Sequence, residues 1–152
     1  MVPVLSGEIA ALLTSSIARV RRISYVQPGG VREGDGGPIE LKLENGAIFR
    51  LESGADGESL RLGVGGWCDP FAEPMSVENR EFVARSGKWV AFDVSCESGY
   101  KELIGRRVGD LGLLVEFGKI VGADLSFGST TLRVSVRADE LFVELQGGDS
   151  CQ

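Results

Sequence analysis

Carboxylate side chains gather in one short stretch of the chain, at Asp69, Glu73, Glu78 and Glu81. Two carboxylates can catalyse glycoside hydrolysis when one of them is desolvated and the pair is held at a fixed separation. Acids on an exposed loop and an exposed helix give the same sequence pattern without catalysis. A carboxylate-based hydrolase is therefore one hypothesis for this chain, and a set of solvated acids is the other.

The same stretch carries aromatic side chains in an irregular segment, GGWCDPFAEP, at residues 65–74. Aromatic residues dominate the hot spots of protein interfaces, so Trp67 and Phe71 are candidate anchors for a protein partner. Asp69 and Glu73 lie beside them and would attract a basic partner. The alternative is a loop that folds its aromatic side chains back onto the core.

The chain has no histidine, which removes the commonest general base at neutral pH and every His-dependent triad. Cys96 would need another activator to act as a nucleophile, so we expect it to be a buried structural thiol. Asp56 and Glu58 share a loop, but a calcium loop needs more oxygen ligands at fixed positions. The glycine runs lack the ending of a phosphate-binding loop. We therefore predict no catalytic residue, no metal site, no cofactor and no enzymatic activity.

Composition constrains the partners and the location. The net charge of −6 argues against nucleic acid, since phosphate binding depends on Lys and Arg, and it favours a basic protein partner. No run approaches the ~20 apolar residues that cross a bilayer, so we expect no membrane partner. Three cysteines without CxxC spacing, and an N-terminus without a basic leader, indicate a cytoplasmic protein. A homo-oligomer that pairs its edge strands is also open.

Alternating apolar and polar residues predict short antiparallel strands along most of the chain. The clearest hairpin spans residues 39–52 around Asn45-Gly46, where a two-residue turn with positive φ at both positions is expected. A strand at 60–64 completes this first meander. In the second meander, Gly118-Lys119 is expected to form a type II′ turn.

We expect one α+β domain over 1–152, made mostly of antiparallel meanders with two short helices. Its expected parts are a short helix at 6–14, a first meander at 16–64, a helix at 76–86, a second strand-rich half at 88–145 and a flexible tail at 146–152. Ser76 is a suitable cap for the second helix and Gly87 ends it. A helical turn is expected at 100–104.

The two meanders resemble each other in sequence. Residues 39–43, IELKL, correspond to residues 123–127, ADLSF, and similar strands follow each segment. The offset is about 84 residues, which would divide the chain into two related halves. Two unrelated amphipathic meanders would look alike at this level too, so duplication stays one of two interpretations.

The layout of the meanders, with Gly87-Lys88-Trp89 at a strand start and Asp139-Glu140-Leu141 before the last strand, resembles small uncharacterised bacterial proteins. Some of those are immunity proteins of polymorphic toxin systems. The resemblance implies a cytoplasmic binder that blocks one toxin by occupying its active or substrate-binding surface. The leading hypothesis is thus a non-catalytic protein-binding module of immunity type. A carboxylate-based hydrolase and a structural or homo-oligomeric protein are the alternatives.

Overall fold

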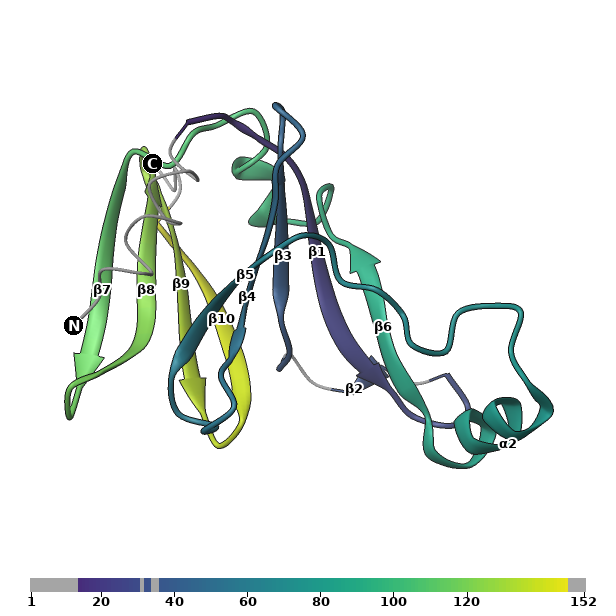
Figure 1. Cartoon of the computed structure of the whole chain (residues 1–152). Coiled ribbons are helices and arrows are strands. Elements are labelled where there is room, and N and C mark those ends of the chain that lie inside the picture. The colour runs from purple at the N-terminus through teal and green to yellow at the C-terminus, as the bar shows by residue number, and fades with distance from the viewer. Residues whose placement is uncertain (1–13, 31, 34–35, 148–152) are drawn as a thin grey trace.

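The computed structural model describes residues 14–30, 32–33 and 36–147, which form two antiparallel sheets, one α-helix and one 3₁₀ turn (Figure 1). In chain order the elements are β1 (Ile17–Val26), β2 (Arg32–Glu33), β3 (Ile39–Leu43), β4 (Ile48–Ser53), β5 (Leu60–Val64), α2 (Val77–Ser86), β6 (Lys88–Asp93), η1 (Tyr100–Glu102), β7 (Asp110–Glu116), β8 (Lys119–Phe127), β9 (Thr130–Arg137) and β10 (Glu140–Gly147). The predicted α+β class, dominated by antiparallel strands, is confirmed.

In the first sheet β1 is hydrogen-bonded on both sides. One side pairs with β3, which continues through β4 into β5 as an antiparallel meander, and the short β2 pairs with the end of β1. The other side pairs with β6 over six residues of each strand, from Arg21 opposite Asp93 to Val26 opposite Lys88. The expected second half at 88–145 is therefore divided: its first strand completes the first sheet, and its later strands build the second.

The second sheet is a meander of β7, β8, β9 and β10 in which each strand pairs with the next. The predicted tail begins too early, because Gln146 and Gly147 are still strand residues of β10. They pair with Thr131 and Thr130 of β9, which gives their backbone groups hydrogen-bond partners that a free tail lacks. The rest of the predicted tail, 148–152, lies outside the described residues.

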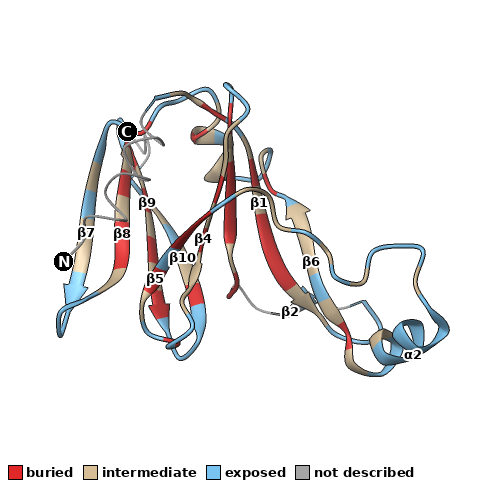
Figure 2. Ribbon diagram, viewed as in Figure 1, coloured by how far each residue is buried: buried red, intermediate tan, exposed pale blue. Residues whose placement is uncertain are grey.

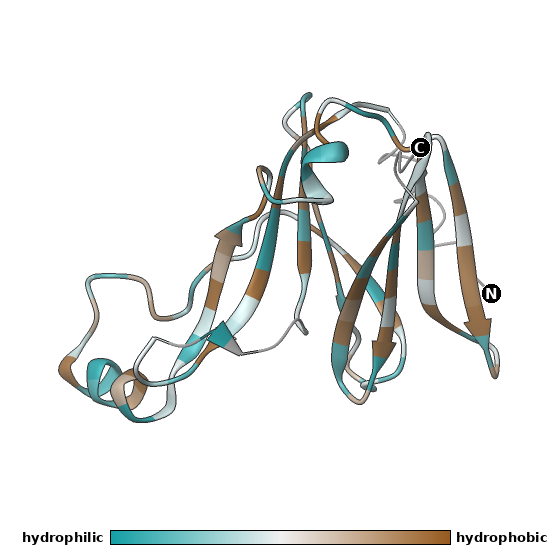
Figure 3. Ribbon diagram, turned by 180° about the vertical axis from the view of Figure 1, so that it is seen from behind, coloured by the Kyte–Doolittle hydropathy of each residue, from teal (hydrophilic) through white to brown (hydrophobic). Residues whose placement is uncertain are grey.

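One hydrophobic cluster lies between the inner faces of the two sheets, where the strands are red in Figure 2. Brown and teal bands alternate along the strands in Figure 3, as a side-chain period of two requires. The first sheet contributes residues such as Leu41, Leu43 and Phe49, and the second contributes residues such as Leu125, Leu132 and Val134. The alternation predicted from the sequence therefore identifies which face of each meander is buried.

The turn at Asn45-Gly46 differs from its prediction. Gly46 has a φ of 96°, but Asn45 is not among the residues with positive φ. The Leu43 N–H donates to the Ala47 carbonyl at 2.8 Å, so the strands are joined by the three residues 44–46. This is the geometry of a type I turn followed by a left-handed glycine. The register that places Leu41 opposite Phe49 leaves three residues for the connection instead of two.

The β7–β8 turn is also shifted from its predicted position. Glu116 pairs with Lys119, so the turn residues are Phe117 and Gly118, with φ values of 51° and 76°. Positive φ at both central positions defines a type I′ turn, not the type II′ turn expected one residue later. Lys119 is the first residue of β8, and its backbone is taken up by the sheet.

The helix α2 matches its predicted bounds and caps. The Ser76 side chain accepts a hydrogen bond from the Asn79 N–H at 3.1 Å, and Gly87 ends the helix with a φ of 78°. The 3₁₀ turn η1 confirms the helical turn expected at 100–104. The expected number of two short helices is not met, because the described residues contain one α-helix. The segment 6–14 lies outside them, apart from Thr14 in a turn.

Replacing Gly37 tests how tightly the junction between the two sheets is built. The Gly37 N–H donates to the Leu141 carbonyl at 3.0 Å, its φ is 125°, and a Cβ would collide with the Ile23 carbonyl oxygen. We expect Gly37→Ala to lower the free energy of unfolding by about 3 kcal/mol, from backbone strain and overpacking. Gly46→Ala, at positive φ in open space, should cost about 1 kcal/mol. Urea unfolding followed by circular dichroism measures both, and equal losses would contradict a rigid junction.

Candidate functional site

The outer face of the first sheet carries a buried carboxylate. Glu40 lies on β3, and its side chain is fully shielded from solvent. Arg21 on β1 donates to both of its oxygens, from Nε at 2.6 Å and from Nη2 at 2.7 Å. The backbone N–H of Trp67 donates to Oε2 at 2.8 Å. Glu40 is thus covered by the segment that follows β5, and it holds that segment in place.

Glu40 keeps its charge in this buried position. Burial by itself raises the pKa of the carboxyl, but the hydrogen bonds from the Arg21 side chain and the Trp67 N–H, together with the charges of Arg21 and Arg19, outweigh it. The net pKa therefore lies below the ordinary value of a glutamate. The pKa of Arg21 is raised, chiefly by its hydrogen bond to Glu40. Glu40 and Arg21 therefore both stay ionised.

Arg50 on β4 provides a second anchor for the same segment. Its Nη1 donates to the Gly65 carbonyl at 2.6 Å. Its guanidinium lies so close to Gly63 that a Cβ there would meet Nη2 at 2.5 Å. Both anchors, Arg50 and Glu40, bind backbone atoms of residues 65–67.

Five aromatic side chains gather beside these anchors, and we call them the aromatic surface: Tyr25, Trp67, Phe71, Phe82 and Trp89. Phe71 stacks on Phe82 of α2 with ring centroids 5.6 Å apart, and Tyr25 meets the edge of Trp89 at 5.7 Å. All five line one cavity of about 300 Å³. Phe82 and Trp89 are 44% and 41% exposed. None of the five belongs to the hydrophobic cluster between the sheets, so this aromatic surface is separate from that core.

The four residues predicted to bind a partner are only partly brought together. Trp67 and Phe71 line the same cavity. Asp69 lies between them, where its Oδ1 accepts the Phe71 N–H at 2.8 Å and its Oδ2 accepts from the Lys88 ammonium at 2.6 Å. Glu73 lies farther along the chain and pairs with Arg80 of α2 at 3.0 Å, in an exposed position. Asp69 and Glu73 therefore each pair with a cation of this chain.

The environment of Asp69 bears on the hydrolase hypothesis. Burial by itself raises the pKa of this carboxyl, but the hydrogen bonds from Lys88 and from the Phe71 N–H outweigh it, so the net pKa is lowered. A general acid in glycoside hydrolysis needs a raised pKa. Asp69 does not meet that requirement.

Sequence reasoning missed Tyr25, Phe82 and Trp89 as members of the site. A signal for Trp89 was present, because the alternation of β6 places Val90 and Phe92 on one face and leaves Trp89 on the other. Phe82 gave no such signal, since an apolar residue on a short helix usually faces the core. Here α2 buries none of its residues and lies away from the two sheets (Figure 2).

Two other candidates from the sequence have ordinary surroundings. The prediction that Cys96 is buried is wrong: β6 ends at Asp93, and Cys96 lies exposed in the turn that follows. Asp56 and Glu58 bind the ammonium of Lys119, at 3.3 and 2.9 Å. A cation of the chain itself therefore takes the place between these carboxylates.

No group of three or more His, Cys, Asp or Glu side chains within the described residues is placed to hold a metal ion. In the same part of the chain, no helix has the length and apolar character that a membrane crossing requires. Comparisons with models of protein families, with curated proteins and with solved structures find no match to this chain. The case for function therefore depends on the surface itself.

Glu40→Gln should destabilise the protein strongly, because it leaves the Arg21 guanidinium without its ionic partner under the loop. We expect a loss of about 3 kcal/mol in the free energy of unfolding, as when one member of a buried pair is removed. Asp124→Asn is the matched control. Asp124 makes the same two-pronged contact with Arg133 across β8 and β9, at 2.7 and 2.8 Å, but the pair is partly exposed, so the loss should stay below about 1 kcal/mol. Similar losses in urea unfolding would contradict this assignment.

The contribution of Glu40 should depend on pH. Because its folded-state pKa is lowered, its stabilising effect is complete above the unfolded-state value and is lost as the pH falls through the folded-state value. The difference in unfolding free energy between wild type and Glu40→Gln should thus be constant near neutral pH and shrink below about pH 4.5. Urea unfolding across this range measures it. A difference that grows on acidification would show that the sign is wrong.

Proposed function

We propose that this chain is a non-catalytic protein-binding module and that the aromatic surface is its contact with the partner. The observation that carries the proposal is that five aromatic side chains outside the core line one cavity, with Phe82 and Trp89 more than two-fifths exposed. Clustered aromatic residues are the usual anchors of protein interfaces. Glu40 and Arg50 hold the segment that carries Trp67, so little conformational entropy is lost on binding.

The charge of the chain supports a basic protein as the partner. The net charge is −6, and complementary charge accelerates the encounter of two proteins and excludes partners of like charge. The immunity-type role that the sequence resemblance implies is the specific form of this proposal. The partner would then be a toxin whose active or substrate-binding surface the aromatic surface covers.

The double variant Phe71→Ser/Phe82→Ser tests the proposal. It removes the stacked pair of rings from the aromatic surface, so capture of the partner should weaken by at least about tenfold, as expected for interface hot spots. Val115→Ser/Phe117→Ser is the matched control, because it removes two exposed apolar side chains from the β7–β8 hairpin. Tagged wild type and both variants are used to capture proteins from a lysate of the source organism, and the captured protein is identified by mass spectrometry. Its affinity for each purified bait is then measured by calorimetry.

A protein that binds wild type and the control variant but not Phe71→Ser/Phe82→Ser supports the proposal. Equal capture by all three baits would show that the aromatic surface is not the interface. Loss of capture with the control variant alone would move the interface to the β7–β8 hairpin. No stoichiometric partner at low salt would count against a protein-binding function.

A further inference from the structure

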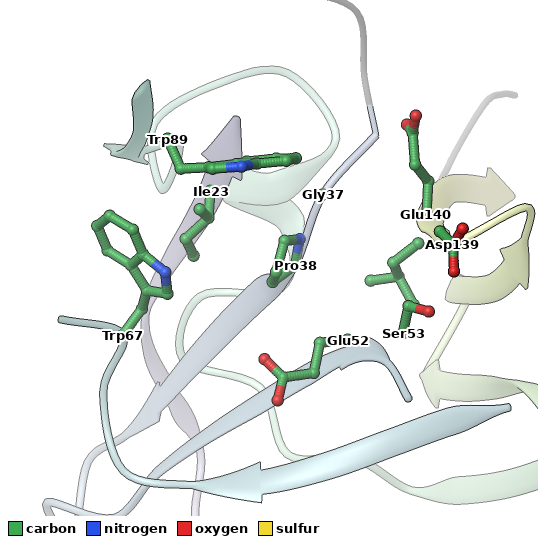
Figure 4. Close-up of a pocket in the computed structure, with 10 residues that line it drawn as sticks. Ile23, Gly37, Pro38, Glu52, Ser53, Trp67, Trp89, Asp139 and Glu140 are labelled. Carbon is green, nitrogen blue, oxygen red and sulfur yellow. The ribbon is translucent and has the colours of Figure 1, made fainter. Parts of the chain in front are cut away.

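A second cavity, of about 280 Å³, adjoins the aromatic surface and shares Trp67 and Trp89 with it. Figure 4 shows the two tryptophans at one end and Asp139 and Glu140 at the other, with Glu52 between them. We call this cavity the tryptophan–acid groove. Its volume is just below the roughly 300–1,000 Å³ of sites for whole small ligands, and it suits a few side chains of a protein segment.

The described residues that line the groove include acidic side chains and no basic ones. Three of its described lining residues carry carboxylates, and none is Lys or Arg. Glu52 is paired with Arg50 at 3.4 Å and with Arg61 at 3.6 Å, and neither arginine is among the described residues that line the groove. Asp139 and Glu140 make no ion pair or side-chain hydrogen bond with the described residues. Negative charge in a cavity with apolar walls attracts and concentrates cations.

The two acids are held in place by the backbone. Ala138 and Asp139 have φ values of 49° and 71°, as in a type I′ turn, and the Asp139 N–H donates to the Gly57 carbonyl at 3.0 Å. The Gly37 N–H donates to the Leu141 carbonyl just beyond Glu140. The turn that carries both carboxylates is thus fixed against the first sheet on two sides.

The two tryptophans, like the acids, suit a cationic ligand. An indole face attracts a cation within about 6 Å of its centre, and an arginine side chain stacks on it with its planar guanidinium. Trp89 is 41% exposed, and the backbone of Trp67 is held by Glu40. Two indoles and two carboxylates without partners are therefore accessible along one groove.

We propose that the tryptophan–acid groove binds a basic, arginine-bearing segment of the partner protein, with guanidinium groups on Trp67 and Trp89 and on Asp139 and Glu140. This inference rests on the proposed function and names the chemistry of the partner's contact segment. Charge complementarity selects it over an acidic or apolar segment, because every charged residue among the described ones that line the groove is an acid.

Intrinsic fluorescence tests the proposal directly, because the chain has two tryptophans and both line the groove. The probe is acetylated tetra-arginine amide, and the same peptide of citrulline, the neutral isostere of arginine, is its control. We expect a saturable fluorescence change with tetra-arginine and binding at least about tenfold weaker with tetra-citrulline. Added salt should weaken the binding of tetra-arginine and leave the binding of tetra-citrulline unchanged.

Asp139→Asn/Glu140→Gln is the decisive variant. Asparagine tolerates the positive φ of position 139, so the turn is retained while both charges are removed. Tetra-arginine binding should weaken by about tenfold, since each partly exposed charge pair contributes a few-fold. Asp110→Asn/Glu116→Gln on β7 removes two negative charges from the same total of −6, and it should change the affinity by less than about twofold.

Equal weakening by both double variants, equal binding of both peptides, or no fluorescence change up to millimolar peptide would overturn the inference. A dimer seen in sedimentation that Asp139→Asn/Glu140→Gln dissociates would also overturn it, because a second copy of the chain would then occupy the groove.

Partner capture separates the two proposals. If Asp139→Asn/Glu140→Gln still captures the partner and Phe71→Ser/Phe82→Ser does not, the binding function stands and the basic-segment inference is wrong. Specific tetra-arginine binding without any captured protein supports the groove and removes the protein-binding function.

Discussion

A buried carboxylate on the outer face of the first sheet fixes the segment that carries Trp67. Glu40 points away from the hydrophobic cluster, yet it has no exposure to solvent, because Arg21 and the backbone of Trp67 enclose it. An ionised group in such a position is stable only when its hydrogen-bonding capacity is filled. The chain after β5 must therefore lie across the outer face of the sheet, and this places Trp67 beside Trp89 and Ile23.

The fold was largely predictable, and the reasons differ from element to element. The period of two assigned the buried faces of β3, β4, β8 and β9, and Ser76 with Gly87 bounded α2, because these signals are local. The pairing of β6 with β1 was not predictable, since Arg21 and Asp93 are joined only by tertiary structure. The same limit applies to the site. Trp67 and Phe71 were recognised from their irregular surroundings. Tyr25 is placed beside Trp89 only by the pairing of β1 with β6, and Phe82 joins the site only through its ring contact with Phe71.

The two meanders show how one sequence pattern leads to two environments. Asp124 and Arg133 are opposite each other on β8 and β9 and form a partly exposed pair. Glu40 and Arg50 are opposite each other on β3 and β4 in the same way, but they do not bind each other. Glu40 turns to Arg21 on the other side, and Arg50 turns to the Gly65 carbonyl. The difference is that residues 65–67 cover Glu40, whereas Asp124 stays partly exposed. The alternating sequence pattern by itself predicts that both acids face solvent.

Glu40 and Arg50, the two anchors of the segment after β5, both bind main-chain atoms: Glu40 accepts from the Trp67 N–H, and Arg50 donates to the Gly65 carbonyl. Main-chain groups are the same whatever side chains the segment carries, and α2 beyond it buries none of its residues. Residues 67–86 are therefore free to diverge during evolution without loss of the sandwiched core. Substitutions there change the side chains that this face presents to solvent, while Glu40 and Arg50 keep the path of the backbone at residues 65–67 constant.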